Sequence, residues 1–327
     1  MSDSAHPVAV GGLERANPGS RLRGILFLLL FAACFSTLIS PPVALALGIL
    51  FGVVLCNPYP AETRKGSPWL LQGSVVALGF GMNLHEVLKA GRSGLLYTAL
   101  SIAFAILAGL LFGQILGVYG NSSYLITAGT AICGGSAIAA IAPILRADEE
   151  EMAVSLGTVF VLNSVALFIF PPLGHALGLS QTQFGLWSAL AIHDTSSVVG
   201  AASRYGAQAL VVGTTVKLAR ALWIVPLCLG IAAAKRSKSK FRFPWFIGLF
   251  CLASLVNTYW SGASSATAAL FEFGRLGLTA TLFLIGSGLS RATLAKVGWR
   301  PLVQGIALWI VVGLTTLYFI RTGWIAL

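Results

Sequence analysis

The stretch Ala131-Ile132-Cys133-Gly134-Gly135-Ser136-Ala137-Ile138 breaks a long apolar run with small polar residues, and a second stretch resembles it. The second reads Ala191-Ile192-His193-Asp194-Thr195-Ser196-Ser197-Val198, with alanine, isoleucine and serine recurring at a shift of 60 residues (131 to 191). Matching interruptions in a duplicated apolar chain are typical of secondary transporters, where they mark the binding site. These two stretches therefore indicate both the fold class and the place to look for function.

The composition predicts an all-α integral membrane protein. Hydrophobic residues make up 57% of the chain and charged residues 9%, with a mean hydropathy of +0.87, whereas soluble domains carry about 25% charged residues. Most apolar runs are near the ~20 residues that a bilayer requires, and we expect about nine to eleven transmembrane segments. The expected full spans are 24–40, 43–56, 68–84, 94–117, 150–173, 209–234, 244–260, 270–288 and 301–320, with 43–56 unusually short.

The ends of these spans predict one transporter domain over residues 24–327, preceded by a polar cytoplasmic tail over 1–23 that lacks the apolar core of a signal peptide. The net charge of +11 does not predict nucleic-acid binding, because the basic residues lie in separate loops. Their distribution instead predicts a multi-pass protein of the inner membrane with a cytoplasmic N-terminus. Arg15, Arg21, Arg23, Arg64, Lys65, Arg146, Lys235, Arg236, Lys238, Lys240, Arg242, Arg291, Lys296 and Arg300 would face the cytoplasm, and Lys89, Arg92, Arg204, Arg275 and Arg321 the outside.

Two further internal resemblances support a duplication. Ala153–Ala176 matches Ala209–Ala232 at a shift of 56, and Gly79–Leu95 matches Gly286–Leu302 at a shift of 207. If the two broken segments are re-entrant hairpins, an odd number of crossings separates the matching points, as inverted repeats require. We favour hairpins entering from opposite faces, and crossing helices with unwound centres are the alternative. The expected repeats are interleaved and cover about 68–173 and 182–320.

The small polar residues of the two breaks are candidates for the substrate site. Gly134 and Gly135 let the chain turn and let a ligand approach the backbone. Two helix N-termini facing one another would form a positively polarised pocket that favours an anion. The alternative is that the small residues only permit close helix packing. Hydroxyl groups in these segments come from Ser136, Thr195, Ser196 and Ser197, and Cys133 is a further candidate for the substrate site.

Ionisable residues inside the apolar runs are few and costly, so each needs a partner or a role. Lys217 and Arg220 lie three residues apart on one helical face, and we expect them to attract the anion. One acid, Asp194, cannot neutralise both, and we expect it to orient one of them or to carry a proton. His193 and Asn163 complete the candidate site, either as ligand groups or through structural hydrogen bonds.

These residues resemble the YeiH-like sulfate-exporter family. The similarity covers nearly the whole chain from about residue 24 and is carried by Gly129 to Ile138, by His193-Asp194 with Ser197 to Ala201, and by Val216 to Arg220. One departure is Asp194, where relatives commonly have glutamate. The resemblance implies an inner-membrane carrier of the cation:proton antiporter and anion transporter superfamily, with inverted repeats and an elevator-like motion.

The sequence therefore favours a secondary transporter of a small anion, sulfate or a related oxyanion, over two alternatives. One is a sodium/proton antiporter using Asp194, and the other is a membrane-embedded enzyme using Cys133 or His193. The sequence shows no catalytic arrangement, cofactor motif or metal-ligand spacing. We therefore expect no enzymatic activity, no cofactor and no metal site. The expected partners are the anion, the lipid bilayer, a coupling proton or sodium ion, and a second copy in a homodimer. The cysteines lack a paired spacing and predict neither disulfides nor a zinc site: Cys34, Cys56, Cys133, Cys228 and Cys251.

Overall fold

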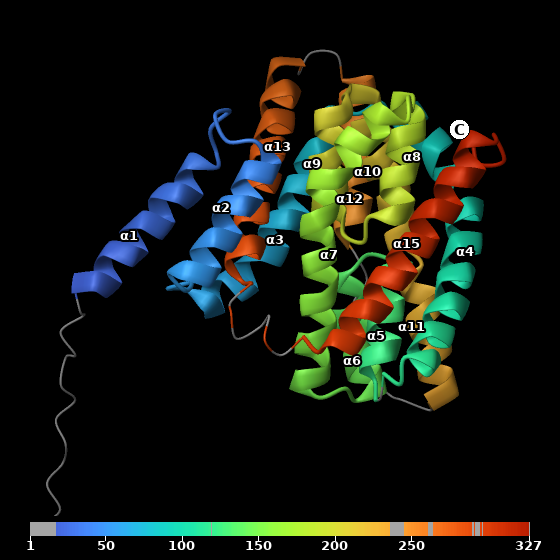
Figure 1. Ribbon diagram of the computed structural model, residues 1–327. Helices are drawn as coiled ribbons and strands as arrows, with labels where there is room; N and C mark the ends of the chain where they lie inside the picture. The colour runs from blue at the N-terminus through green and yellow to red at the C-terminus, as the bar shows by residue number, and fades with distance from the viewer. Residues whose placement is uncertain are drawn as a thin grey trace, which may run out of the picture.

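The computed structural model describes residues 18–118, 120–235, 245–260, 264–289, 291, 295 and 297–326, and the regular elements in these ranges are helices (Figure 1). In chain order they are α1 (Pro18–Ala33), α2 (Pro41–Val54), α3 (Pro60–Gly79), α4 (Leu84–Ile115), α5 (Ser122–Ala131), α6 (Gly135–Leu145), α7 (Glu149–Ala176), α8 (Gln181–Ala191), α9 (Thr195–Tyr205), α10 (Ala207–Ala221), α11 (Ile224–Lys235), α12 (Trp245–Tyr259), α13 (Ser264–Ser287) and α15 (Trp299–Arg321).

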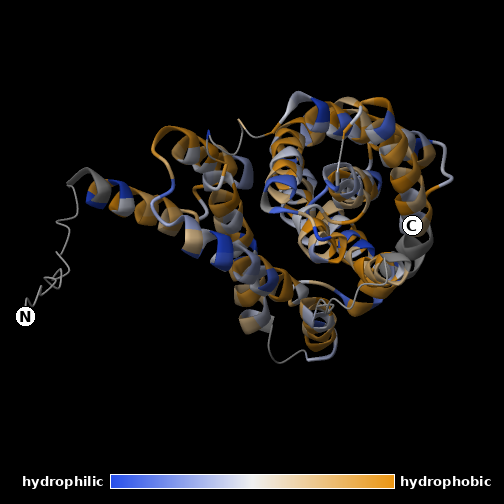
Figure 2. Cartoon of the chain, turned by 90° about the horizontal axis from the view of Figure 1, so that it is seen from below, coloured by the Kyte–Doolittle hydropathy of each residue, from blue (hydrophilic) through white to orange (hydrophobic). Residues whose placement is uncertain are grey.

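The helices have the length and composition of membrane-spanning segments. Five stretches within the described residues are long and apolar enough to cross a membrane: Tyr97–Ile115, Glu150–Ala176, Ala207–Ala233, Ser265–Ser287 and Trp299–Arg321. Large apolar side chains are exposed along the outer faces of several helices, and apolar residues follow the helices throughout the molecule (Figure 2). The prediction of an all-α integral membrane protein is confirmed at this level. Of the predicted tail, residues 1–17 lie outside the described part of the chain, and α1 begins at Pro18.

The helices form two groups (Figure 1). One group contains α2, α3 and α13, which pack closely together, with α1 at its outer edge. The other contains α4 to α11 and α15. Helix α12 packs against both α3 and α4, and α9 packs against α13, so the groups are joined at these places.

The chain folds back on itself at each predicted break. Before α5, the backbone N–H of Asn121 donates to Oε1 of Glu151 on α7 at 2.6 Å, so the start of α5 lies beside the residues that follow α6. At the other end of α7, the hydroxyl of Tyr205 on α9 donates to the carbonyl oxygen of Leu179, just before α8, at 2.6 Å. The pairs α5–α6 and α8–α9 therefore form two helical hairpins, at opposite ends of α7 (Figure 1).

Helix boundaries recur at the shifts seen in the sequence. At a shift of 60, α6 (Gly135–Leu145) corresponds to α9 (Thr195–Tyr205) at both ends, and α5 corresponds to α8 within one residue. The shift of 56 relates α7 to α10, and the shift of 207 relates α4 to α15. Contacts follow the same relation: α5 packs on α4 and α7, and its counterpart α8 packs on α15 and α10. One difference concerns the span expected over 209–234, which is interrupted between α10 and α11 at Leu222 and Trp223.

Local signals explain where the helices that flank the breaks begin. Asp148 caps α7 by accepting from the N–H of Glu151, whose side chain accepts from the N–H of Asp148 in return. Ser180 and Gln183 form the same reciprocal cap at the start of α8. The acidic run after Arg146 is thus a helix start, as its charge at the positive end of a helix suggests.

Candidate functional site

The tips of the two hairpins meet inside the second group of helices. A Cβ atom placed on Gly134 would lie 3.3 Å from Cβ of Asp194 and 3.3 Å from Cγ1 of Val159 on α7. Gly134 is thus in direct contact with the residue that matches it at the shift of 60. The predicted proximity of the two broken segments is present in the structure.

The first break needs glycine for its backbone path. Gly134 has φ +65° and ψ −126°, a combination that other residues rarely adopt. Its N–H donates to the carbonyl oxygen of Gly129 at 2.8 Å, which closes the end of α5. After the turn, Sγ of Cys133 lies 2.8 Å from Oγ of Ser136, and Ser136 is exposed. Gly135 instead lies against the ring of Phe160.

The second break is organised by Asp194, which is the N-cap of α9. Oδ1 accepts from the hydroxyl of Ser196 at 2.6 Å and from the N–H of Ser197 at 2.7 Å, and Oδ2 accepts from the hydroxyl of Ser197 at 2.9 Å. Asp194 is 7% exposed, and its carboxylate neutralises the positive end of α9. Thr195 is half-buried beside it.

The two intramembrane cations lie on α10 and are fully buried, each with 0% exposure. Arg220 donates from Nε to the carbonyl oxygen of Ala131 at 2.7 Å and from Nη1 to that of Leu190 at 2.7 Å. It therefore ties the C-terminus of α5 to that of α8. Lys217 donates from Nζ to the carbonyl oxygen of Ile192 at 2.6 Å. Both cations thus bind the negative ends of broken helices, where unpaired carbonyls accumulate.

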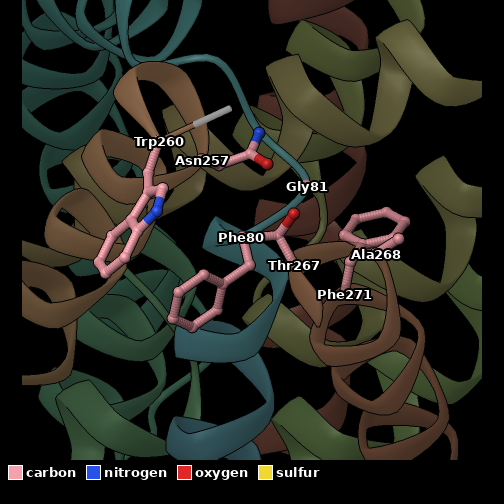
Figure 3. A pocket seen from close by; sticks show the side chains of 7 residues that line it. All are labelled: Phe80, Gly81, Asn257, Trp260, Thr267, Ala268 and Phe271. Atoms are coloured by element: carbon pink, nitrogen blue, oxygen red, sulfur yellow. The ribbon is translucent and has the colours of Figure 1, made fainter. Parts of the chain in front are cut away.

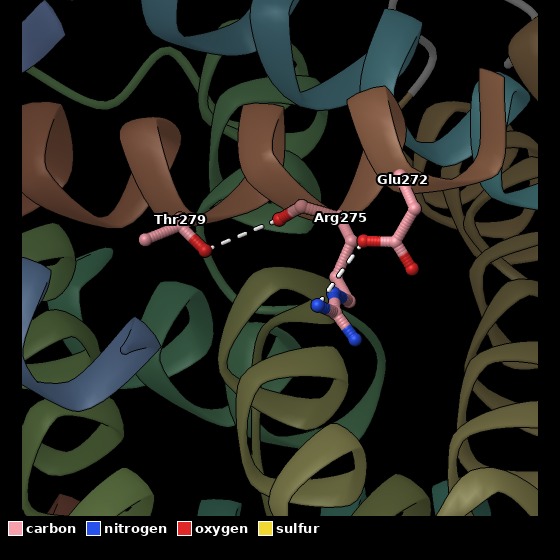
Figure 4. A network of polar contacts seen from close by, with 3 residues as sticks. All are labelled: Glu272, Arg275 and Thr279. Atoms are coloured by element: carbon pink, nitrogen blue, oxygen red, sulfur yellow. Dashed lines mark hydrogen bonds and ion pairs between the residues drawn. The ribbon is translucent and has the colours of Figure 1, made fainter. Parts of the chain in front are cut away.

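This arrangement differs from the expected pairing of Asp194 with a cation. The carboxylate is held by two serines, and the ion pair between described residues joins Arg275 and Glu272 on α13 at 3.1 Å (Figure 4). That pair is about half exposed and is expected to contribute little to stability. Asp194 therefore does not orient Lys217 or Arg220 by direct contact, because its oxygens cap α9 instead.

Several buried polar atoms around the hairpin tips have no hydrogen-bond partner. Oδ1 of Asn163 accepts from the N–H of His193 at 3.1 Å, but the side-chain nitrogen of Asn163 is unpaired. Nη2 of Arg220 is also unpaired, although Arg220 is 0% exposed. Buried polar groups are almost always paired, so an unpaired nitrogen here is a group that a polar ligand or ordered water could bind.

The structure places the sequence-predicted residues on the two hairpins, on α7 and on α10. It also adds groups that the sequence did not identify, namely the carbonyl oxygens of Ala131, Leu190 and Ile192. No side-chain pattern marks them, since every residue carries a carbonyl. One general rule could have predicted these partners: cationic side chains are stabilised at helix C-termini, and Lys217 and Arg220 are cationic.

Two cavities lie elsewhere and contain none of these residues. One, of about 300 Å³, lies where α3, α12 and α13 meet and is lined by Phe80, Asn257, Trp260 and Phe271 among others (Figure 3). The other, of about 380 Å³, lies by the starts of α5, α7 and α15 and is lined by Asp148, Glu151 and Arg300 among others. Neither adds a group to the site at the hairpin tips.

Comparison with known proteins identifies the family. The family described as conserved hypothetical protein 698 matches residues 23–305. A UPF0324 membrane protein of Bacteroides thetaiotaomicron is 50% identical over 289 residues, which is 88% of each chain. One from Geobacter sulfurreducens is 46% identical over 308 residues, or 94% of this chain and 99% of the relative. No solved structure matches the chain. The chain belongs to this family of membrane proteins, in agreement with its YeiH-like motifs.

Proposed function

We propose that this protein is a secondary transporter that carries a small anion across the inner membrane by alternating access. The observation that carries the proposal is the placement of charge at the hairpin tips. Lys217 and Arg220 neutralise the negative ends of α5 and α8, and Asp194 neutralises the positive end of α9. The N-cap of α6 is Gly134, which has no carboxylate to neutralise the positive end of that helix, so this end is left for a ligand.

The same contacts favour an anion over the alternatives. For a sodium/proton antiporter, Asp194 would have to offer oxygen atoms to a cation, but three of the roughly four acceptor positions of its carboxylate already hold hydrogen bonds. For an enzyme, Cys133 would need a base within hydrogen-bond reach, and its sulfur instead contacts the hydroxyl of Ser136. Sulfate and related oxyanions remain the proposed substrates, as the family resemblance implies.

Unequal exposure of the matching helices supports alternating access. On α6, Ser136 and Ala139 are exposed, whereas their counterparts on α9, Ser196 and Val199, are buried. Helix α9 is covered by α13 and α2, and α6 packs on α5, α7 and α11. We infer that the hairpins enter the bilayer from opposite faces and that the site is reached along α6 in this state. Because the two halves are related by the repeat, the protein can adopt a second, similar packing in which α9 is exposed and α6 is buried.

The test of the proposed function is a thermal unfolding series on the purified protein. Sodium sulfate, sodium acetate and sodium nitrate are compared with sodium chloride at equal ionic strength, and sodium with potassium salts. A ligand that binds only the folded state raises its stability, by about 2.7 kcal/mol at 100 times Kd. We expect a saturable rise in unfolding temperature with at least one oxyanion. A response that follows the cation and ignores the anion would favour the antiporter.

The proposed topology is tested by cysteine labelling in intact cells. In a protein without its native cysteines, Ala176→Cys at the end of α7 is expected to react with an impermeant maleimide, and Glu150→Cys at the start is not. Both positions are exposed in the structure, so accessibility from the medium decides the result. Permeabilised cells provide the control, since both variants should then react. Labelling of Glu150→Cys alone in intact cells would show the opposite orientation.

A further inference from the structure

The repeat relation assigns a specific place to the anion. We propose, building on the transport function above, that the head group of a small oxyanion binds at the N-terminus of α6, in the place that corresponds to the Asp194 carboxylate at α9. The head group is a carboxylate or a sulfur oxyanion, with at least two oxygens to accept hydrogen bonds. The proposal rests on residues of the two hairpins that match at the shift of 60.

The α9 hairpin shows what this kind of site holds. There the carboxylate of Asp194 binds three donors from Ser196 and Ser197, and all of them lie in the first turn of the helix. The site is closed, because Ser196 and Ser197 are 0% and 1% exposed. In α9 the anion is thus a permanent part of the protein.

Helix α6 begins at the position that matches the start of α9, but it has no carboxylate at its N-cap. Gly134 stands where Asp194 stands, and it offers no side-chain cap to α6. Ser136 stands where Ser196 stands, and Ala137 stands where Ser197 stands. Both groups now bind Cys133: the hydroxyl of Ser136 donates to the carbonyl oxygen of Cys133 at 3.1 Å, and the N–H of Ala137 donates to its sulfur. An anion would take over these two donors. Helix α6 runs for 11 residues, enough for a positive end. Ser136 is exposed, so an anion can reach these donors from outside the bundle.

A second observation points to an anion at the same place. Arg220 is fully buried, and its Nη2 lacks a hydrogen-bond partner although Nε and Nη1 are both used. The guanidinium and the amine of Lys217 both lie close enough to the Cys133 sulfur to interact electrostatically with it. That sulfur contacts the hydroxyl of Ser136. A thiol is a weak acceptor, so an oxyanion replaces it favourably at these donors.

The experiment measures the apparent Kd for sodium sulfate and sodium acetate from unfolding temperatures of the purified full-length protein. Ser136→Ala removes one donor to the anion and is expected to weaken the apparent Kd about 10- to 100-fold. Ser136→Asp places a carboxylate in the site and is expected to abolish the response, while the ligand-free protein stays folded because an acid suits the first helical turn. Ser203→Ala on α9 is the matched control, since its hydroxyl bonds only within its own helix.

The outcomes separate this inference from the transport function. Sulfate also stabilises proteins without binding, and that effect is expected to persist in all variants, so only the saturable part counts. If the wild-type protein responds and Ser136→Ala and Ser136→Asp respond equally well, the α6 site is wrong while anion binding stands. If Ser196→Ala is the variant that loses the response, the anion binds at α9. If the wild-type protein responds to no anion, the proposed function itself fails.

Discussion

Replacing Arg220 with methionine is expected to lower the stability of the protein strongly. The side chain of Arg220 joins the ends of two broken helices through the carbonyl oxygens of Ala131 and Leu190. Methionine fills similar space but leaves both carbonyls buried without a donor. Each such group costs about 1–3 kcal/mol, so we expect a loss of about 2–6 kcal/mol and a clear fall in unfolding temperature.

Two controls separate this contact from the effect of charge alone. Arg220→Lys keeps the charge but cannot donate to both carbonyls through a planar fork, so an intermediate loss is expected. Arg275→Met removes an arginine from the half-exposed pair on α13 and is expected to change stability by less than about 1 kcal/mol. An unchanged unfolding temperature for Arg220→Met would contradict the bridging role.

Replacing Gly134 with alanine is the second change with a large expected effect. The backbone of Gly134 has a positive φ, and an added Cβ would press on Asp194 and Val159 at 3.3 Å each. Strained backbone of this kind costs about 1–3 kcal/mol, and relief would require the hairpin tips to separate. We expect both a lower unfolding temperature and the loss of the saturable anion response.

The matched control for Gly134→Ala is Gly73→Ala on α3. Gly73 lies within a helix, has no atom within 4 Å of an added Cβ and has no positive φ. Alanine suits a helix interior better than glycine, so this variant is expected to be neutral or slightly more stable. Equal behaviour of the two variants in unfolding and in anion response would refute a special role for Gly134.

The amino-acid sequence by itself determined the membrane class and the position of the two breaks. The long apolar runs leave few other folds, and Gly134 and Gly135 are local signals for a turn. The shift of 60 residues that relates the two breaks in the sequence also relates the helices beside them in the structure. These features depend on neighbours in the chain, which is why they could be read without a structure.

Only the tertiary structure decided the partners of the buried charges. Arg220 binds carbonyl oxygens that lie 89 and 30 residues away in the chain, and Asp194 binds its own helix. The sequence shows that two cations and one acid must be accommodated, but a carbonyl oxygen is present at every residue and carries no distinguishing signal. Which helix end meets Arg220 depends on how the hairpins pack, and apolar helix surfaces specify that packing through shape alone.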